Sequence, residues 1–547
     1  MAVLQEPNIP IIYVRGYAMT SSERDETAAD PFCGFNVGST VYRAIADRHS
    51  SAKKFVFESP VVRLVTEFQY KNVYQDGFDI LDPNWENPPG PDGTRPVGIP
   101  GASIIIYRYY DPGSNLVGDG KSQDIRIYAA GLGRLILKVR ELVLLRAGPA
   151  LAPVDFKCYL AAHSMGGLVV RTLLQNKHLN GFDDDPSIDA STARNCVAKV
   201  FTYATPHNGI EFAGINVPAW LTRFEMSTFN RSVMAEYLAT PSVDDRVDYL
   251  PDDISPPGDQ WFTMIGSNRG DYETAQGASR MFAGHGSDGL VKIENASLKY
   301  RERVTSPQGA GFTPYKRVAS AYAYRSHSGY FGIVNSEEAY QNLVRFLFGD
   351  VRVDVWLDVE SVTLPTQLQG KDVDAVYQME IIASTNGKRW SLSRRIAEED
   401  SPACPTHAEL TSDDPEKKRI YLSTIFMANR SKVNRARPGL TYAMTLGVRV
   451  PDYEVDRKFW IDGHFEGGNL FRDMLIVNVD PPAKAGGQWI VRHGWQAQQG
   501  AQATVYTNVK ELADGKLEMI IPLWKSNVGP PDPSISGNIR FVASLWQ

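Results

Sequence analysis

The chain has 547 residues, of which 43% are hydrophobic and 22% are charged, and its formal net charge is −6. That length predicts two or three domains, and the composition is that of an ordinary globular protein. The small negative charge argues against a nucleic-acid partner, and no apolar stretch approaches the roughly 20 residues that span a bilayer.

The cysteines and the first residues bear on the cellular compartment. The start of the chain, Met-Ala-Val-Leu-Gln-Glu-Pro, lacks the basic and apolar segments of a secretory signal. The four cysteines have no metal-type spacing, and Cys158 and Cys196 stand in apolar runs, where buried thiols are usual. We therefore expect a protein that acts in the cytoplasm or is exported without a visible signal peptide.

Strand-like and helix-like segments alternate over the first 350 residues. Apolar and β-branched runs predict strands at residues 9–14, 103–110, 156–163, 197–204, 261–265 and 318–324. Apolar residues at helical spacing predict helices at residues 41–49, 129–145, 164–175 and 336–348. Such alternation predicts a mostly parallel sheet with helices on both faces.

The third of these strands leads through a serine directly into a helix. Residues 156–171 read Phe-Lys-Cys-Tyr-Leu-Ala-Ala-His-Ser-Met-Gly-Gly-Leu-Val-Val-Arg. This is the layout of the nucleophile elbow of α/β-hydrolases, where a tight turn raises a hydroxyl above the edge of the sheet. Ala162, Gly166 and Gly167 provide the small residues that such a turn needs. We interpret Ser164 as a nucleophile; the motif alone is also compatible with a plain turn between a core strand and a helix.

An insertion at residues 208–259 separates two of the predicted strands. Apolar residues at positions 220, 221, 224, 233, 234, 237 and 238 predict one apolar helical face within it. That face could pack on the core. In a hydrolase, this position favours a lid or a wall of the acyl site.

A nucleophilic serine needs a neutral imidazole as its base and a carboxylate that orients the imidazole. In α/β-hydrolases the acid and then the histidine follow the serine along the chain. Of nine histidines, only His327 follows the last strand and precedes the last helix of this part, whereas His163 adjoins the serine and is expected to point elsewhere. Asp288, in a glycine-containing turn, is favoured as the acid over its rival Asp271.

The oxyanion hole needs two backbone N–H groups, one after the nucleophile and one from the loop after an early strand. Met165 supplies the first. The amide of Tyr17 is the predicted second donor, because Gly16 lets the backbone turn towards the substrate.

The pattern changes near residue 350. Apolar residues alternate with period two at residues 351–359, 376–383, 420–427, 442–450, 474–479, 502–509, 517–523 and 539–546. Turns rich in proline and glycine separate these runs. We therefore predict a catalytic domain over residues 1–350 and an all-β, sandwich-like domain over residues 351–547.

Three segments resemble those of bacterial true lipases and related esterases of the α/β-hydrolase superfamily. Ala162-His-Ser-Met-Gly-Gly167 resembles the alanine-variant elbow of small Bacillus-type lipases. Ala204-Thr-Pro-His-Asn-Gly-Ile-Glu-Phe-Ala213 and Gly286-Ser-Asp-Gly-Leu-Val291 are similar to segments of Burkholderia- and Pseudomonas-type lipases. Arg15 replaces the usual histidine of the oxyanion loop. Gly329 stands where the calcium-binding lipases have aspartate, so their structural calcium is not expected here.

The resemblance and the ordered triad imply hydrolysis of carboxylic esters through an acyl-enzyme, with no metal and no cofactor. The expected substrate is an ester or lipid with an apolar acyl group, reached through interfacial contact of the lid or the β-rich domain. The same residues leave three alternatives open. These are a phospholipase-type lipid acyl hydrolase effector, a lipid- or polymer-binding protein whose β-rich domain targets the hydrolase, and an amidase or acyltransferase.

Overall fold

The structure is a computed structural model. It describes residues 8–16, 40–43, 53–56, 60–73, 80–82, 85–87, 89–90, 92–109, 123–179, 190–212, 215–216, 227–270, 285–306, 309–328, 332–385, 388, 390–432, 439–455, 463–480, 489–498, 505–507, 509–512, 514–524 and 533–546. The chain divides into two compact units. One comprises Met1–Ser320 with Arg325–Leu343, and the other comprises Ala321–Tyr324 with Val344–Gln547.

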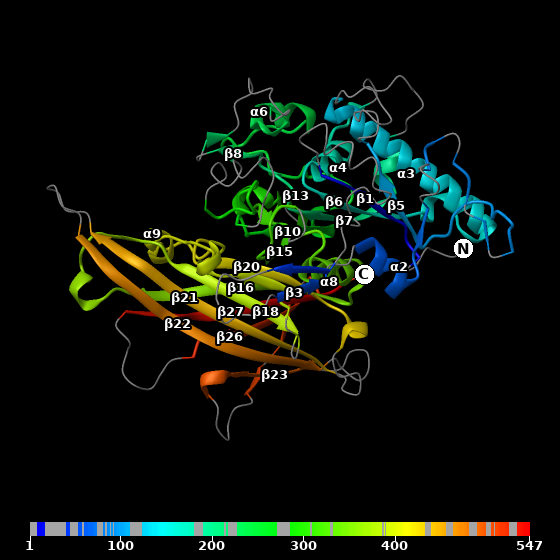
Figure 1. The fold of residues 1–547 in the computed structure, drawn as a ribbon. Helices are drawn as coiled ribbons and strands as arrows, with labels where there is room; N and C mark the ends of the chain where they lie inside the picture. Colours follow the sequence, from blue (N-terminus) through cyan, green and yellow to red (C-terminus); the bar gives the residue numbers. More distant parts are fainter. Residues whose placement is uncertain are drawn as a thin grey trace. The chain divides into compact units, whose positions relative to one another are not determined.

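A seven-stranded sheet is the centre of the first unit (Figure 1). Its strands, in spatial order, are β15 (Ala319–Ala323), β10 (Trp261–Gly266), β7 (Val197–Tyr203), β6 (Cys158–His163), β1 (Ile11–Val14), β5 (Ser103–Tyr107) and β4 (Lys71–Asn72). The pairings that join β10 to β4 through this order are all parallel. The predicted mostly parallel sheet is therefore confirmed.

Helices flank this sheet. They are α2 (Pro60–Phe68), α3 (Ile125–Ala147), α4 (Met165–Gln175), α5 (Ala190–Asn195) and α8 (Glu337–Phe348). Helix α3 packs on α4 and α5, and Figure 1 draws α2 and α8 on the other side of the sheet. Arg63 of α2 donates to Glu337 of α8 at 2.6 Å, and its guanidinium lies 3.5 Å from the ring centroid of Tyr340. Both faces of the sheet are thus covered, as in an α/β-hydrolase architecture.

The central strands are apolar without alternation because both of their faces are buried. All four residues of β1 are 0% exposed. Ile12 and Val14 belong to the core cluster that also contains Leu132 of α3 and Leu168 of α4. Tyr13 points to the opposite face, where it lies near Tyr203 and Tyr340 and burial raises its pKa.

Two helix predictions differ from the structure. The helix expected at residues 41–49 is wrong in its described part, because Thr40–Arg43 forms β2, paired antiparallel with β3 (Lys53–Val56). The residues Thr-Val-Tyr-Arg are β-branched, aromatic or long, which suits a strand better than a helix. The helix expected from residue 129 begins earlier, at Ile125, because the side chain of Asp124 accepts the amide of Arg126 and caps it.

The insertion at residues 208–259 contains a shorter helix than expected. Helix α6 spans Arg231–Tyr237, and its cap Asn230 accepts the amides of Ser232 and Val233. Met234, Tyr237 and Leu238 are buried in the main core cluster. Positions 220, 221 and 224 lie outside the described residues. The described part of the apolar face therefore packs on the core.

Short strand pairs complete the first unit. They are β8 (Glu211–Phe212) with β9 (Ile215–Asn216), β11 (Lys299–Tyr300) with β14 (Lys316–Arg317), and β12 (Arg303–Ser306) with β13 (Gly309–Phe312).

The second unit is built from antiparallel strands, as the alternating pattern predicts. One sheet has the order β20 (Arg419–Met427), β16 (Val351–Thr363), β27 (Ser534–Leu545), β26 (Leu517–Pro522) and β25 (Lys510–Glu511). The other runs β19 (Ser393–Arg395), β18 (Gln378–Thr385), β21 (Leu440–Val455), β22 (Gly463–Asp480), β23 (Ile490–Trp495) and β24 (Val505–Thr507), with β17 (Val373–Ala375) paired to β21. A short helix, α9, spans His407–Thr411.

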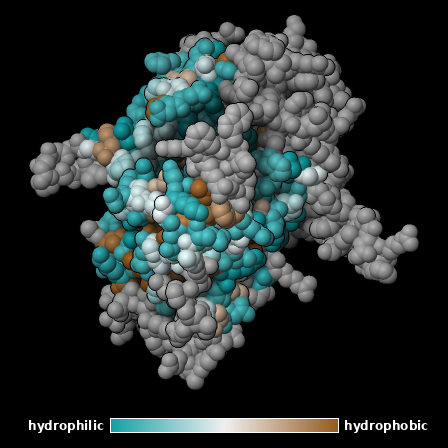
Figure 2. All heavy atoms as spheres, turned by 90° about the vertical axis from the view of Figure 1, so that its left-hand side faces the viewer, coloured by the Kyte–Doolittle hydropathy of each residue, from teal (hydrophilic) through white to brown (hydrophobic). Residues whose placement is uncertain are grey.

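Side chains from both of these sheets share one buried cluster, which includes Leu357 of β16, Leu446 of β21 and Ile521 of β26. Along β16, Val355, Leu357 and Val359 are buried, whereas Trp356 and Asp358 between them are half-buried. In the view of Figure 2 the coloured surface is mostly hydrophilic, with hydrophobic residues in small separate patches. Within the described ranges, no helix is both long enough and apolar enough to cross a bilayer.

Candidate active site

Ser164 occupies a strained turn between β6 and α4. Its φ of 52° and ψ of −127° lie outside the regions that most residues with a side chain adopt. The turn is fixed from behind, since the amide of Ser164 donates to the carbonyl of Tyr203 at 2.9 Å. This geometry raises the side chain above the end of β6, as a nucleophile elbow does.

The glycines after Ser164 are required by close approach. A Cβ on Gly166 would lie 2.4 Å from the carbonyl oxygens of Val14 and Arg15. A Cβ on Gly167 would lie 2.2 Å from Oγ1 of Thr205, in the loop after β7. Helix α4 can therefore start directly against β1 and against the loop after β7 only because these two positions lack side chains.

Three buried side chains meet beyond the carboxyl ends of the parallel strands. Oγ of Ser164 lies 2.8 Å from Nε2 of His327, and Nδ1 of His327 lies 2.9 Å from Oδ2 of Asp288. Their relative exposures are 5%, 3% and 1%. The structure thus brings the predicted serine, base and acid within hydrogen-bonding distance, from segments as far apart as 163 residues in sequence.

Asp288 is held by its own loop. Its Oδ1 accepts the amides of Leu290 at 3.0 Å and Val291 at 2.8 Å, which leaves Oδ2 for His327. Gly289 has a φ of 101°, which closes the turn, and a Cβ on Gly266 at the end of β10 would lie 2.9 Å from the Asp288 Cβ. The direction of the carboxylate is therefore set by backbone contacts. The rival acid, Asp271, lies outside the described residues.

The backbone of His327 is also held on both sides. Its amide donates to the carbonyl of Asp288 at 2.9 Å. Its carbonyl lies 2.8 Å from Nε2 of His163, and the two imidazole rings are 5.0 Å apart. The ring of His163, which was not expected to face the serine, thus meets the backbone of His327. Nothing in the sequence pattern distinguishes this orientation, because it depends on where the loop after β15 comes to lie.

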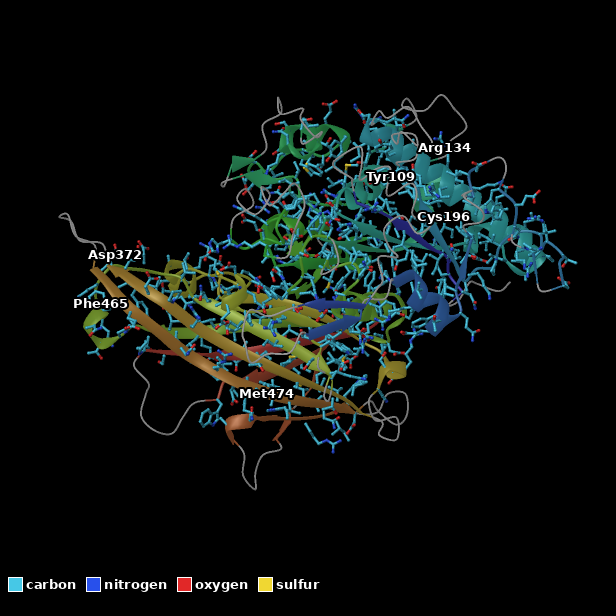
Figure 3. All side chains as sticks on the ribbon, in the orientation of Figure 1. Tyr109, Arg134, Cys196, Asp372, Phe465 and Met474 are labelled. Carbon is cyan, nitrogen blue, oxygen red and sulfur yellow. The ribbon has the colours of Figure 1, made fainter. Side chains whose placement is uncertain are left out.

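The predicted oxyanion loop is described only up to Gly16, and Tyr17 lies outside the described residues. A Cβ on Gly16 would lie 2.7 Å from the Cβ of Ser164, so the backbone there passes directly beside the serine. The phenol of Tyr109 donates to the carbonyl of Arg15 at 2.8 Å. Figure 3 labels Tyr109 near α3, where its ring lies 4.8 Å from that of Tyr128. Met165 is the first residue of α4, a position where backbone N–H groups have no acceptor within the helix.

The segment after β7 lies beside the group formed by Ser164, His327 and Asp288, and its contacts are with other residues. His207 is 0% exposed, and its Nε2 lies 3.1 Å from Oγ1 of Thr202. The carbonyl of His207 accepts from Arg171 of α4 at 2.8 Å, and the same guanidinium donates to the carbonyl of Val247 at 2.8 Å. Burial lowers the pKa of Arg171 to about 10. Arg171 thereby ties α4 to two loops.

In the part of the chain that the structure describes, no group of three or more histidine, cysteine, aspartate or glutamate side chains is arranged to hold a metal ion.

Comparison with known proteins gives only distant structural similarity. No protein-family model and no curated protein match the chain. The mature form of the Bacillus licheniformis lipase BlEst2 is similar over 63% of this chain and 92% of its own, with 14% identity and a TM-score of 0.28. Its propeptide form matches over 88% and 96%, with 12% identity and a TM-score of 0.26. A gene product of Listeria innocua matches over 62% and 94%, with 10% identity and a TM-score of 0.24. At these values the likeness carries no conclusion about what this chain binds or cleaves.

Proposed function

We propose that this chain is a serine hydrolase that cleaves carboxylic esters, as esterases and lipases do, through an acyl-enzyme on Ser164. The observation that carries the proposal is the pair of distances that join three buried side chains, 2.8 Å between Ser164 and His327 and 2.9 Å between His327 and Asp288. In such an arrangement, a carboxylate fixes the tautomer of the imidazole that takes the hydroxyl proton.

The proposed reaction proceeds in two halves. Nδ1–H of His327 donates to Asp288, so Nε2 is free to accept the proton of Ser164 as its Oγ attacks the acyl carbon. The imidazolium then protonates the leaving alcohol. A water molecule attacks the acyl-enzyme with His327 again as base, which releases the acid and restores the serine. Asp288 stays ionised and stabilises the imidazolium in both halves.

The developing oxyanion needs backbone donors rather than side chains. We propose the amides of Met165 and Tyr17, in agreement with the helix start at Met165 and with the backbone of Gly16 beside Ser164. Because both donors belong to the main chain, changes of the side chain at these positions would act through the shape of the site.

The larger divisions of the chain belong to the same proposal. We assign residues 1–350 as the catalytic domain, residues 208–259 within it as a lid or acyl-site wall, and residues 351–547 as a sandwich-like domain. The insertion separates β7 from β10, and the loops after both strands contribute to the surroundings of the triad. The cluster of side chains shared by the two antiparallel sheets favours a sandwich. The substrate would be an ester with an apolar acyl group.

The test replaces the nucleophile. Ser164→Ala should lower hydrolysis of p-nitrophenyl esters by at least about 10⁴-fold without changing the circular dichroism spectrum. Ser191→Ala, on the exposed surface of α5, is the matched control and should keep full turnover. A fluorophosphonate probe should label the wild-type chain at Ser164. Retained turnover in Ser164→Ala would remove this residue from the mechanism.

A substrate panel then separates the activities that share this triad. Short and medium acyl esters, a phospholipid, an emulsified triglyceride and an acyl anilide would be compared at equal enzyme concentration. Preference for soluble esters indicates an esterase, preference for the emulsion indicates a lipase, and cleavage of the phospholipid or anilide indicates the phospholipase or amidase alternative.

A further inference from the structure

The residue before the nucleophile connects the serine with its base. His163 is the last residue of β6, is 7% exposed, and its Nε2 lies 2.8 Å from the carbonyl oxygen of His327. The rings of the two histidines are 5.0 Å apart at an interplanar angle of 42°. The last residue of β6 and the residue after it therefore both bond to the proposed base, His163 to its backbone and Ser164 to its ring.

The hydrogen bond fixes the state of the His163 ring. A carbonyl oxygen only accepts, so Nε2 of His163 carries the hydrogen and donates it. Burial, followed by the charge that His327 can carry, lowers the pKa of His163 well below its usual value. A neutral ring in the Nε2–H form is therefore the state that this site favours.

The same ring also touches the oxyanion loop. A Cβ on Gly16 would lie 2.7 Å from Nδ1 and 3.2 Å from Cε1 of His163, so the backbone of Gly16 passes close to this ring. The imidazole of His163 thus stands between the loop after β1 and the loop after β15. Both loops must stay at a fixed position relative to Ser164, so that the base and the oxyanion donors act on the same substrate geometry.

We propose that His163 is a positioning residue, whose imidazole holds the backbone of His327 so that the base keeps its bond to Ser164. This inference rests on the proposed function. Four contacts then fix the base: its ring bonds to Ser164 and to Asp288, its amide donates to the carbonyl of Asp288, and its carbonyl accepts from His163. Loss of the contact from His163 removes the hydrogen bond to the carbonyl of His327, and the bond from the amide of His327 to Asp288 remains.

A role in packing alone would not need a polar ring here. The other residues of β6 are Cys-Tyr-Leu-Ala-Ala, and an apolar side chain at the last position would continue that pattern without burying a donor. The polar ring is compensated by one carbonyl, and that carbonyl belongs to the proposed base.

The test compares two substitutions of similar size in the full chain. His163→Met removes the donor, whereas His163→Gln places an amide nitrogen near the position of Nε2. We expect His163→Met to lower kcat about tenfold with KM within twofold of wild type, as the loss of one net hydrogen bond implies. His163→Gln should recover kcat to within about threefold of wild type. Equal kcat in both variants, or a loss confined to KM, would overturn the proposal.

A measurement on the wild-type chain does not depend on activity. Nitrogen NMR with labelled histidine, assigned through His163→Gln, should show His163 as the neutral Nε2–H tautomer. The Nδ1–H tautomer or a charged ring would contradict the bond to His327 and overturn the inference. Absence of ester turnover and of phosphonate labelling would instead reject the proposed function, and the tautomer would still decide whether His163 holds His327.

Discussion

The loops after β7 and β15 each carry a buried histidine beyond a strand of the same sheet, and they differ in what the ring meets. His327 lies between a carboxylate and a serine hydroxyl. His207 meets the hydroxyl of Thr202, and within the described chain its Nδ1 has no hydrogen-bond partner. The backbone carbonyl of His207 accepts a hydrogen bond from Arg171. Under the proposed mechanism, burial after a strand does not by itself make a histidine a general base, because an orienting carboxylate is also needed.

The largest expected effect on activity comes from replacing each of the two histidines, one at a time, by glutamine. His327→Gln should lower kcat/KM for a p-nitrophenyl ester by about 10⁵-fold or more, because His327 is the proposed acceptor of the Ser164 proton. His207→Gln should keep kcat per folded molecule and lower only the melting temperature. If both folded variants lose activity equally, the distinction between the two loops fails.

An intermediate effect on activity is expected when His327 loses its carboxylate partner, because its surroundings then resemble those of His207. Asp288→Asn replaces the carboxylate by a neutral amide, which no longer selects the tautomer with Nδ1–H. We expect kcat to fall about 10⁴-fold with the fold retained. Asp155→Asn, in the turn before β6, is the control for the loss of one carboxylate. Activity near wild type in Asp288→Asn would point to another acid, with Asp271 the first to test.

The smallest effect concerns stability at low pH. Burial, followed by the charge of Arg171, lowers the pKa of His207 well below its usual value. Below the unfolded pKa of about 6.5 the unfolded chain binds a proton that the folded chain does not, so stability is full above this pH and falls as the pH is lowered. From about pH 6.5 to about pH 5.5 the loss is about 1 kcal/mol for such a histidine.

His207→Gln should therefore melt with a weaker pH dependence than wild type over this range. Melting temperatures measured at several pH values in one buffer system provide the check. Identical slopes for the two proteins would mean that His207 is charged in the folded state or is not buried as described.

The fold could be predicted from the sequence wherever a long hydrophobic pattern identifies the strand or helix. β1 and β6 are apolar throughout because both faces of the sheet are covered, and β16 alternates because only one of its faces is buried. Residues 41–43 were misassigned because a short amphipathic run fits either a helix or a strand, and its pairing with β3 decides the outcome. The early start of α3 depends on one side-chain cap at Asp124.

The site could be predicted as far as chain order constrains it. Ser164, Asp288 and His327 could be selected because each follows a strand of a parallel sheet, where carboxyl ends share one edge. Their roles stay predictions, as does the donor at Tyr17. The orientation of His163 and the anchoring of Arg15 by Tyr109 could not be predicted, because each joins segments that only the tertiary structure brings together.

The backbone conformation of Ser164 limits how far the thermal stability of the protein can be raised. A positive φ is accessible to glycine at little cost and is unfavourable for serine. The chain therefore has at position 164 a residue type that destabilises the native backbone conformation there. Variants selected for heat resistance alone would be drawn towards Ser164→Gly, which relaxes the turn and discards the hydroxyl. At this one position, a gain in thermal stability would therefore cost the hydroxyl on which the proposed reaction depends.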